Sequence, residues 1–411
     1  MSLTIKIEEA VIIYQTVSPD AIDRITKTTE HDVTTNLIYS EEEVLIENGV
    51  ENEKVFHYIP TSIDLTMWDF SSTVEALMEN LGDREQFLAL KIYDDSVVHF
   101  YGWINAATYD HIDETWLIGA VDFNKFITEK YIPWVLTTAG RPLGTVNPAE
   151  SLFQYLRYIV GTYTTPNLLY FVSSIEIDVG SMGRNFDYDE MVVLATDGMT
   201  EFAFLKEVQK HFAAYFYIDT SGVANFINRM EALNTTAIAI DDDILDDTLI
   251  RTKTDPKYNS LLLNVYGDWS EWNGNLGTDV HGHYEGWGVL WFEAGEIRTF
   301  TGVNADLSNI EGRHRYLDLR QKLQSPSYSW KVFDFRDPEI TLNAYKDVIV
   351  PTEKIECVIN RIDINAMEKV SINSINYQVV NSAKNIIKNS SELVLKKLWV
   401  QKYYTAKGNH V

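Results

Sequence analysis

Two short runs concentrate side chains of metal-binding type. The first, "DDDILDD", contains five aspartates: Asp241, Asp242, Asp243, Asp246 and Asp247. Carboxylates this dense can bind a hard cation, but a calcium loop between two helices also needs alternating ligands, a central glycine and a closing glutamate, which this run lacks. We therefore expect a solvated acidic turn here, with a cation site as the alternative.

The second run, "DVHGHYEGW", alternates Asp279, His281, His283 and Glu285. On an extended strand, alternate side chains share one face, as the ligands of a single metal ion would. The run is also rich in glycine, and a His-x-His spacing often arises by chance. We expect a surface loop here, and a metal site is the alternative.

No nucleophile stands in a recognisable catalytic arrangement. His314 is isolated, and Cys357, the only cysteine, lies on an alternating run that is typical of a buried strand. Some pair among the 60 acidic residues can always be imagined as the acid and base of a glycosidase, but that reaction depends on a carboxyl separation that a sequence does not give. We therefore predict no catalytic, cofactor-binding or metal-binding residue and no enzymatic activity.

Four tryptophans offer a further candidate site, because indole rings stack on sugars: Trp269, Trp272, Trp287 and Trp291. In a β-rich protein, tryptophans more often occupy the core or an interface. We expect core or interface positions, and carbohydrate binding is the alternative.

The elements that must position these residues are mainly strands. Residues 1–135 contain successive alternating runs, such as "LTIKIEEAVIIYQTV" and "QFLALKIYD", and predict an N-terminal β-barrel-like domain. Within it, "SSTVEALMENLG" fits either a short loop or a helical turn. Strand-like runs return over residues 256–411 and predict a C-terminal β-rich region that includes a second barrel-like domain. The predicted fold class is therefore β-rich α+β, with an intervening α+β region over residues 136–255.

Two helices and a hairpin define this middle region. The first helix follows Pro148, and the second, over residues 201–216, is capped by Thr200; "YIDTSGVANFINR" then predicts a hairpin. A third helical segment interrupts the C-terminal strands at residues 312–324. The apolar residues at helical spacing in the three segments are Leu152, Leu156, Ile159 and Val160; Leu205, Val208, Phe212 and Tyr215; and Tyr316, Leu319 and Leu323.

A final hairpin is expected in residues 369–399. The apolar side of its first strand changes between Asn373 and Ile375, which predicts a bulge or a barrel corner. Its second strand is apolar on both faces, which favours burial against its own barrel and against a neighbour. The lysines of the hairpin carry a charge opposite to that of the rest of the chain and would suit docking on another copy.

The charge of the chain is large and unevenly placed. The net charge is -26; residues 349–411 hold nine Lys and Arg against five Asp and Glu, which leaves 25 against 55 on residues 1–348. A field of this sign disfavours specific binding to DNA and to anionic membranes, but it suits a protein past which DNA slides. The sequence has no run of about 18 apolar residues and no signal-peptide pattern at its start, so we predict no membrane span.

Several segments, taken in order, resemble the central hub proteins of phage baseplates and tail tips. They are "VVHFYGWINAATYD" with Phe100, Gly102 and Ile104, followed by "WLIGAVDFNKFI"; the helix and hairpin of "GMTEFAFLKEVQKHFAAYFYIDTSGVANFI"; and "DDDILDDTLIRTKTDPKYNSLLLNVYG", in which Tyr258, Asn264 and Gly267 hold the family's places. The final hairpin looks like the strand pair that closes a hub's second barrel. The resemblance covers about residues 85–400.

This resemblance implies a homotrimer in which each subunit supplies two similar β-barrel-like domains. Three subunits would form a quasi-sixfold ring that matches a sixfold tail tube on one side and a threefold spike on the other, with a channel for DNA. It also implies contacts with tail tube, distal tail and other baseplate proteins, and with a separate spike or tail-lysin chain. The protein would be a virion component of the tail, assembled in the host cytoplasm.

Two other functions fit the sequence. A distal tail ring protein has a similar barrel but forms hexamers. A tail-fibre β protein that binds or cleaves carbohydrate would use the tryptophans and acidic residues.

Overall fold

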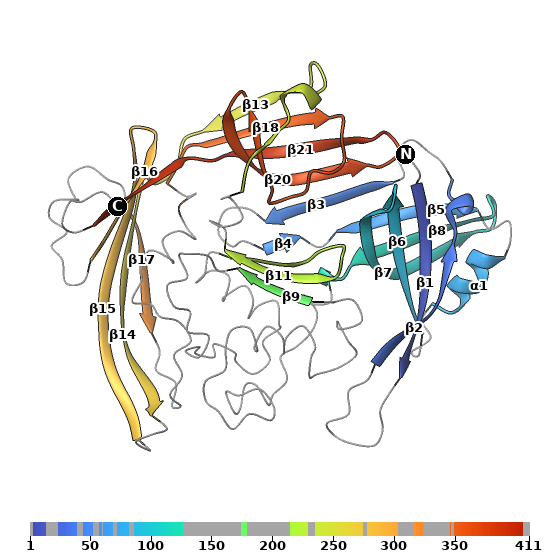
Figure 1. Ribbon diagram of the computed structural model, residues 1–411, viewed down its shortest axis with the longest axis horizontal. Helices are drawn as coiled ribbons and strands as arrows, with labels where there is room; N and C mark the ends of the chain where they lie inside the picture. Colours follow the sequence, from blue (N-terminus) through green and yellow to red (C-terminus); the bar gives the residue numbers. More distant parts are fainter. Residues whose placement is uncertain are drawn as a thin grey trace.

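The computed structural model describes residues 3–13, 24–38, 44–51, 57–59, 61–68, 72–81, 86–125, 174–178, 214–228, 235–273, 278–302, 316–323, 346 and 349–405. These residues form four β-sheets, one short α-helix and two 3-10 turns (Figure 1). The predicted β-rich α+β class is confirmed. Within the described residues, the sheets are open and none closes into a barrel.

The first sheet comes from the N-terminal part of the chain. Its strand order is β2-β1-β6-β7-β8-β5, and every neighbouring pair is antiparallel. The strands are β1 (Leu3–Ile13), β2 (Arg24–Asp32), β5 (Ser62–Trp68), β6 (Gln86–Asp94), β7 (Val97–Asp110) and β8 (Thr115–Asp122).

Strict alternation explains why these residues form strands. In β5, Ile63, Leu65 and Met67 are buried while the intervening residues face outward, as a half-buried strand requires. The segment that fitted either a loop or a helical turn contains the helix α1 (Thr73–Glu79), which buries Val74 and Leu77 in the same core. A 3-10 turn, η1 (Thr34–Asn36), follows β2.

The second sheet comes mainly from the C-terminal part of the chain. Its main path is β12-β19-β20-β21-β18-β13. The strands are β12 (Ile238–Ala239), β13 (Ile250–Thr254), β18 (Thr352–Ile359), β19 (Lys369–Ile372), β20 (Ile375–Asn385) and β21 (Ser390–Lys397). Its core includes Cys357, Val370, Tyr377 and Leu393.

An N-terminal strand completes this C-terminal sheet. β3 (Leu45–Glu51) pairs antiparallel with β20, and its other edge pairs with β4 (His57–Ile59). Ile46 of β3 is buried in the core of the first sheet, together with Ile362 and Ile386 from the C-terminal part. Backbone hydrogen bonds therefore hold β3 in the second sheet, and the two sheets share a core.

The predicted hairpin of the middle region is confirmed. β10 (Ala214–Ile218) and β11 (Val223–Asn228) are antiparallel, and β9 (Ser174–Asp178) adds a parallel strand to β11. Tyr215, expected in the last turn of a helix, lies instead in β10. The remainder of that predicted helix and the predicted helix after Pro148 lie outside the described residues.

A long ribbon forms the fourth sheet, in the order β17-β14-β15-β16-β22. It contains β14 (Ser260–Asn273), β15 (Thr278–Glu293), β16 (Glu296–Gly302), β17 (Tyr316–Leu323) and β22 (Val400–Thr405). The helix predicted at residues 312–324 is wrong, because β17 pairs in parallel with β14. Leu317 and Leu319 also alternate, and sequence reasoning selected the helical period instead of this one.

Residues 369–399 form two hairpins rather than one. β19 and β20 meet at a two-residue turn, Asn373–Ser374, in which both φ angles are positive, at 50° and 63°, as in a type I′ turn. The change of apolar side at this point is therefore a turn, and the predicted bulge or barrel corner is wrong. The bulge of this segment lies farther along β20, between Val379 and Asn381.

Among the described residues, no helix has the length and apolar character needed to cross a membrane.

Candidate functional site

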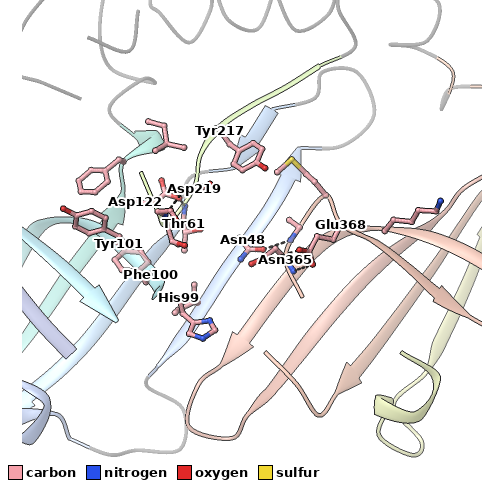
Figure 2. Close-up of a pocket in the computed structure, with 18 of the residues that line it drawn as sticks. Asn48, Thr61, His99, Phe100, Tyr101, Asp122, Tyr217, Asp219, Asn365 and Glu368 are labelled. Atoms are coloured by element: carbon pink, nitrogen blue, oxygen red, sulfur yellow. Dashed lines mark hydrogen bonds between the residues drawn. The ribbon is translucent and has the colours of Figure 1, made fainter. Parts of the chain in front are cut away.

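A cleft of about 600 Å³ lies where the first sheet, the middle hairpin and the second sheet meet (Figure 2). Asn48 of β3, His99 of β7 and Asp122 of β8 line it from the N-terminal part. Asp219, after β10, lines it from the hairpin, and a loop at residues 365–369 lines it from the second sheet. Residues from all three parts of the chain therefore line this cleft.

Asp122 is the most deeply buried acid of the cleft, with 7% of its surface exposed. Its Oδ2 accepts a hydrogen bond from the Thr61 amide at 2.9 Å, and its Oδ1 accepts one from the Asn124 amide at 3.0 Å. Burial raises the pKa of Asp122 to about 6, and these hydrogen bonds offset part of the effect. The carboxyl group orders the end of β8 against the start of β5.

Asn124 attaches the middle hairpin to the first sheet. Its Nδ2 donates to the Ile218 carbonyl at 3.0 Å, and its Oδ1 accepts from the Ile218 amide at 2.7 Å. Asn124 is 6% exposed. The side chain therefore pairs with the amide and the carbonyl of Ile218, at the end of β10, as the backbone of a neighbouring strand would.

The turn between β10 and β11 is held by one carboxylate. Asp219 Oδ1 accepts hydrogen bonds from the amides of Ser221 at 2.8 Å and Val223 at 3.0 Å. Its Oδ2 accepts one from Asn225 Nδ2 at 3.3 Å. The acid closes the hairpin that forms one wall of the cleft.

The opposite wall is a loop of the second sheet. The Ala366 amide donates to Asn48 Oδ1 at 2.9 Å, which ties the loop to β3. Glu368 Oε2 accepts from the Asn365 amide at 2.8 Å, and Asn365 Oδ1 accepts from Lys384 Nζ at 2.5 Å. Burial lowers the pKa of Lys384 to about 8.

His99 lies on the floor of the cleft (Figure 2). Burial lowers the pKa of His99, and the charge of Lys384 lowers it further. The described polar groups around it are engaged mainly with backbone groups and with one another, in contacts that hold the three parts of the chain together. Among the described residues, no three His, Cys, Asp or Glu side chains are grouped as metal ligands would be.

The raised pKa of Asp122 predicts a specific dependence of stability on pH. Between about pH 4 and pH 6 the folded protein binds a proton on Asp122 that the unfolded chain releases, so this group contributes more stability as the pH falls through 6. The free energy of unfolding of the wild-type protein, minus that of Asp122→Asn, is expected to rise by about 2–3 kcal/mol from pH 7 to pH 4. Urea unfolding at a series of pH values measures this difference, with exposed Asp113→Asn as the control for loss of one charge. If the difference in unfolding free energy between the wild type and Asp122→Asn did not change with pH, the prediction would be contradicted.

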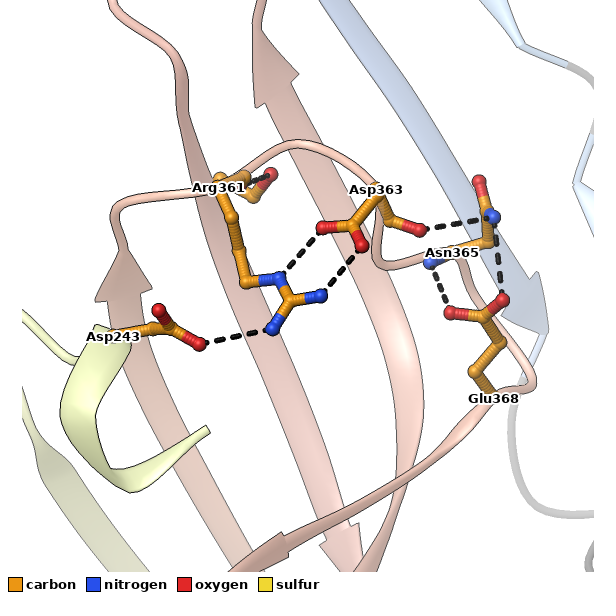
Figure 3. Close-up of polar contacts among 6 residues, drawn as sticks. Asp243, Arg361, Asp363, Asn365 and Glu368 are labelled. Carbon is orange, nitrogen blue, oxygen red and sulfur yellow. Dashed lines mark hydrogen bonds and ion pairs between the residues drawn. The ribbon is translucent and has the colours of Figure 1, made fainter. Parts of the chain in front are cut away.

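The aspartate run contains a 3-10 turn, η2 (Asp241–Asp243), and two of its acids contact the second sheet. Figure 3 shows the contact of Asp243 with Arg361. Asp243 Oδ2 accepts from Arg361 Nη1 at 3.0 Å, while Arg361 also holds Asp363 through two hydrogen bonds of 2.6 and 2.5 Å. Asp241 Oδ1 accepts from the Asn373 amide at 2.6 Å. These contacts pin the turn to the end of the sheet.

The histidine run lies on a strand, so the expected surface loop is wrong. Asp279, His281, His283 and Glu285 occupy alternate positions of β15, which pairs with β14 from Thr278 to Trp291. Continuous pairing on a long ribbon accommodates the glycines that suggested a loop. A metal site on these residues remains the untested alternative, and His314 lies outside the described residues.

The four tryptophans do not gather at one point of the ribbon. Trp272 pairs opposite Asp279, and Trp291 pairs opposite Ser260 at the other end of β14. At roughly 3.3 Å per residue, these ladder positions are about 40 Å apart. The prediction that Cys357 is buried structure is confirmed: it is 3% exposed, and burial raises its pKa to about 11.

Three lysines of the final hairpins are used within the chain. Lys384 and Lys396 are 3% and 4% exposed, and Lys397 Nζ lies 3.5 Å from Glu353 Oε2. Burial alone would raise the pKa of Glu353, but the hydrogen bond from Arg251 and the nearby cations lower it below its usual value. These three lysines therefore do not form the docking surface that their charge suggested.

Sequence reasoning missed the polar residues that join the parts of the chain. These residues are Asn48, Asn124 and the pair Gln378–Tyr215. The Nε2 atom of Gln378 lies 2.5 Å from the Oη atom of Tyr215. Their only signal was a polar residue within or beside an apolar strand pattern. Such a residue must find a hydrogen-bond partner when buried, but its partner is far away in the sequence.

No protein-family model matches the chain, and no curated protein matches it. Among solved structures, it is similar to the 43 kDa tail protein of prophage MuSo2 from Shewanella oneidensis, with a TM-score of 0.48 and 11% identity over 96% of this chain and 98% of that chain. It is also similar to prophage tail protein gp18 from Listeria monocytogenes EGD-e, with a TM-score of 0.48 and 12% identity over 96% and 94% of the two chains. The tail protein from Neisseria meningitidis MC58 gives a TM-score of 0.48 and 9% identity over 95% and 96%.

Proposed function

We propose that the protein is a structural component of a phage tail and, more specifically, the trimeric hub that joins the tail tube to the spike. The proposal rests on the ordered segments that resemble baseplate and tail-tip hubs. One structural observation supports it most directly: β3, a strand of the second sheet, buries Ile46 in the core of the first sheet, so the two sheets form a single body.

This join suits a protein whose role is geometric. If each subunit supplies two β units, three subunits present six units around one axis, so a threefold assembly can meet a sixfold tube. Such a match requires the two units of a subunit to keep a fixed spacing. The shared core opposes relative movement of the two sheets. The β3–β20 ladder and the hydrogen bond from the Ala366 amide to Asn48 fix β3, which contributes Ile46 to that core, within the second sheet.

The charge distribution fits a channel for DNA. The excess of acidic residues on residues 1–348 would repel the phosphate backbone if it faced the lumen of the ring. We further propose that the chain has no turnover reaction, makes contact with tube, distal tail, spike or lysin and other baseplate proteins, and resides in the virion tail after assembly in the host cytoplasm.

The oligomeric state tests the proposal. We expect the purified chain to have the mass of a trimer by native mass spectrometry and to appear as a ring by electron microscopy, over a concentration series and at two salt concentrations. Six copies in the ring would favour a distal tail ring protein instead. A monomer at every concentration would contradict the hub.

A further inference from the structure

We infer that β13 is the site at which a second copy of this chain docks, by pairing with β2 of that copy into one continuous sheet. The inference deepens the proposed trimer by naming its contact, and it rests on the proposed function only for the number of copies. The argument starts from two strand edges.

β13 is an open edge of the second sheet. It pairs with β18 on one side, and within the described residues no strand pairs with its other side. All five of its residues are exposed, and Ile250 at its start has 58% of its surface exposed, next to Leu249 at 44%. An exposed edge with apolar residues is a template for pairing with another strand.

β2 is the corresponding open edge of the first sheet. It pairs with β1, and no described strand pairs with its outer side. The other end of that sheet, β5, is partly covered, because Leu37 bridges to Met67 and the Ile38 amide donates to the Thr66 carbonyl at 3.0 Å. β2 is therefore the more accessible edge of the first sheet.

The charges of the two edges are complementary at the same spacing. β13 carries Arg251 and Lys253 at alternate positions, with side chains 45% and 64% exposed. β2 carries Glu30 and Asp32 at alternate positions. If the strands pair antiparallel with Thr252 opposite His31, Arg251 faces Asp32 and Lys253 faces Glu30, and cross-strand neighbours of opposite charge stabilise such a pair.

Charged residues on the strands next to β13 and β2 contact the charged residues of these two edges. Glu353 of β18, the strand that pairs with β13, is 3% exposed and contacts Arg251, Lys253 and Lys397. On the other side, Lys6 Nζ lies 2.6 Å from Glu30 Oε1. The joined sheet would therefore place Glu30, Lys253, Glu353 and Lys397 in one cross-strand row in which acid and base alternate, and Lys6 contacts Glu30 from the neighbouring row, where it lies opposite Asp32.

The two edges lie on different parts of the molecule, so the contact must form between copies. Figure 1 shows β13 along the upper border and β2 at the lower right. Pairing of β13 with β2 is thus head-to-tail, and every added copy leaves one β13 and one β2 for the next. Such contacts produce a closed ring or an open chain, depending on the rotation between copies.

Cysteine cross-linking tests the contact directly. The full chain carrying Thr252→Cys is mixed with the full chain carrying His31→Cys and mildly oxidised; we expect a disulfide-linked dimer that neither variant gives alone. The native Cys357 is buried, so the wild-type chain is the blank. Thr108→Cys, on the exposed part of β7, replaces His31→Cys in the matched control pair and is expected to give at least tenfold less cross-linked product.

A second measurement needs no variant. The amides of residues 250–254 are expected to exchange with deuterium at least tenfold more slowly in the assembled wild-type protein than in the protein diluted to monomer. Lys253→Glu is expected to shift assembly to at least tenfold higher concentration, whereas Ile112→Glu, which changes a 90% exposed residue of the β7–β8 turn, leaves assembly unchanged.

The outcomes separate this contact from the hub. Cross-linking in a trimer supports both, and cross-linked open chains without a trimer support the contact and contradict the hub. A trimer that shows no cross-link above the control and no protection of β13 overturns the contact and leaves the hub standing. A monomer without cross-links overturns both.

Discussion

Replacing Gly102 with alanine is expected to destabilise the protein by about 3 kcal/mol or more. Gly102 lies in β7, where an added Cβ would lie 2.3 Å from the Val121 carbonyl oxygen and 2.7 Å from Phe100 Cζ. The first of these atoms belongs to the backbone of β8, which cannot rotate away. The ladder between β7 and β8 must therefore separate locally, next to the cleft residue Asp122 that pairs opposite Gly102.

Gly119→Ala is the matched control, because it makes the same change in the neighbouring strand β8. An added Cβ there would first meet Asp64 Oδ1 at 3.1 Å, at the end of a flexible side chain. We expect Gly119→Ala to change the free energy of unfolding by less than about 1 kcal/mol. Urea unfolding of both variants measures the difference, and equal effects would rule out the close approach as the cause.

Asn124→Ala is expected to release the middle hairpin from the first sheet and to destabilise the protein by about 2–4 kcal/mol. The change leaves the buried amide and carbonyl of Ile218 without their present partners, and each unsatisfied buried group costs roughly 1–3 kcal/mol. The effect should be local. Relative to the wild type, the substitution is expected to accelerate deuterium exchange more at the amides of residues 214–228 than at those of β6 and β7.

Two comparisons sharpen this test. Asn376→Ala removes an exposed asparagine side chain from β20 and is expected to change stability by less than about 0.5 kcal/mol. Asn124→Asp keeps the acceptor for the Ile218 amide but places a carboxylate oxygen against the Ile218 carbonyl, so it should be nearly as harmful as alanine. An Asn124→Asp variant as stable as the wild type would show that the bond to the carbonyl is unimportant.

The strands of the first sheet were largely predictable, because alternation is a local signal. In "QFLALKIYD", the buried residues Leu88, Leu90 and Ile92 are separated by residues that face away from the core. The same signal identified β7 and β8, and the Asp/Ser/Gly turn identified the β10–β11 hairpin. β2 was not identified, since "RITKTTEHD" has few apolar residues and is a strand only because it pairs with β1.

Errors arose where a pattern had two readings or where the partner was distant. "YLDLRQKL" has apolar residues that fit both a period of two and a helical period, and only pairing with β14 decides between them. The apolar side of "KVSINSINYQVV" changes because the chain reverses at Asn373–Ser374, and a tight turn with positive φ gives the same pattern as a bulge. The cleft was not predictable, since Asn124 and Ile218 are 94 positions apart.

The pairing of β3 with β20 determines when the second sheet can form during synthesis. Glu47 of β3 and Asn381 of β20, whose side chains are linked by a hydrogen bond of 2.7 Å, are 334 positions apart. At about 5–20 residues per second, β20 leaves the ribosome tens of seconds after β3. Through that interval, β3 lacks its β20 partner while the first sheet can already fold. The second sheet can therefore be completed only late in synthesis, and a nascent chain stalled before β20 would expose a strand edge that the finished protein covers.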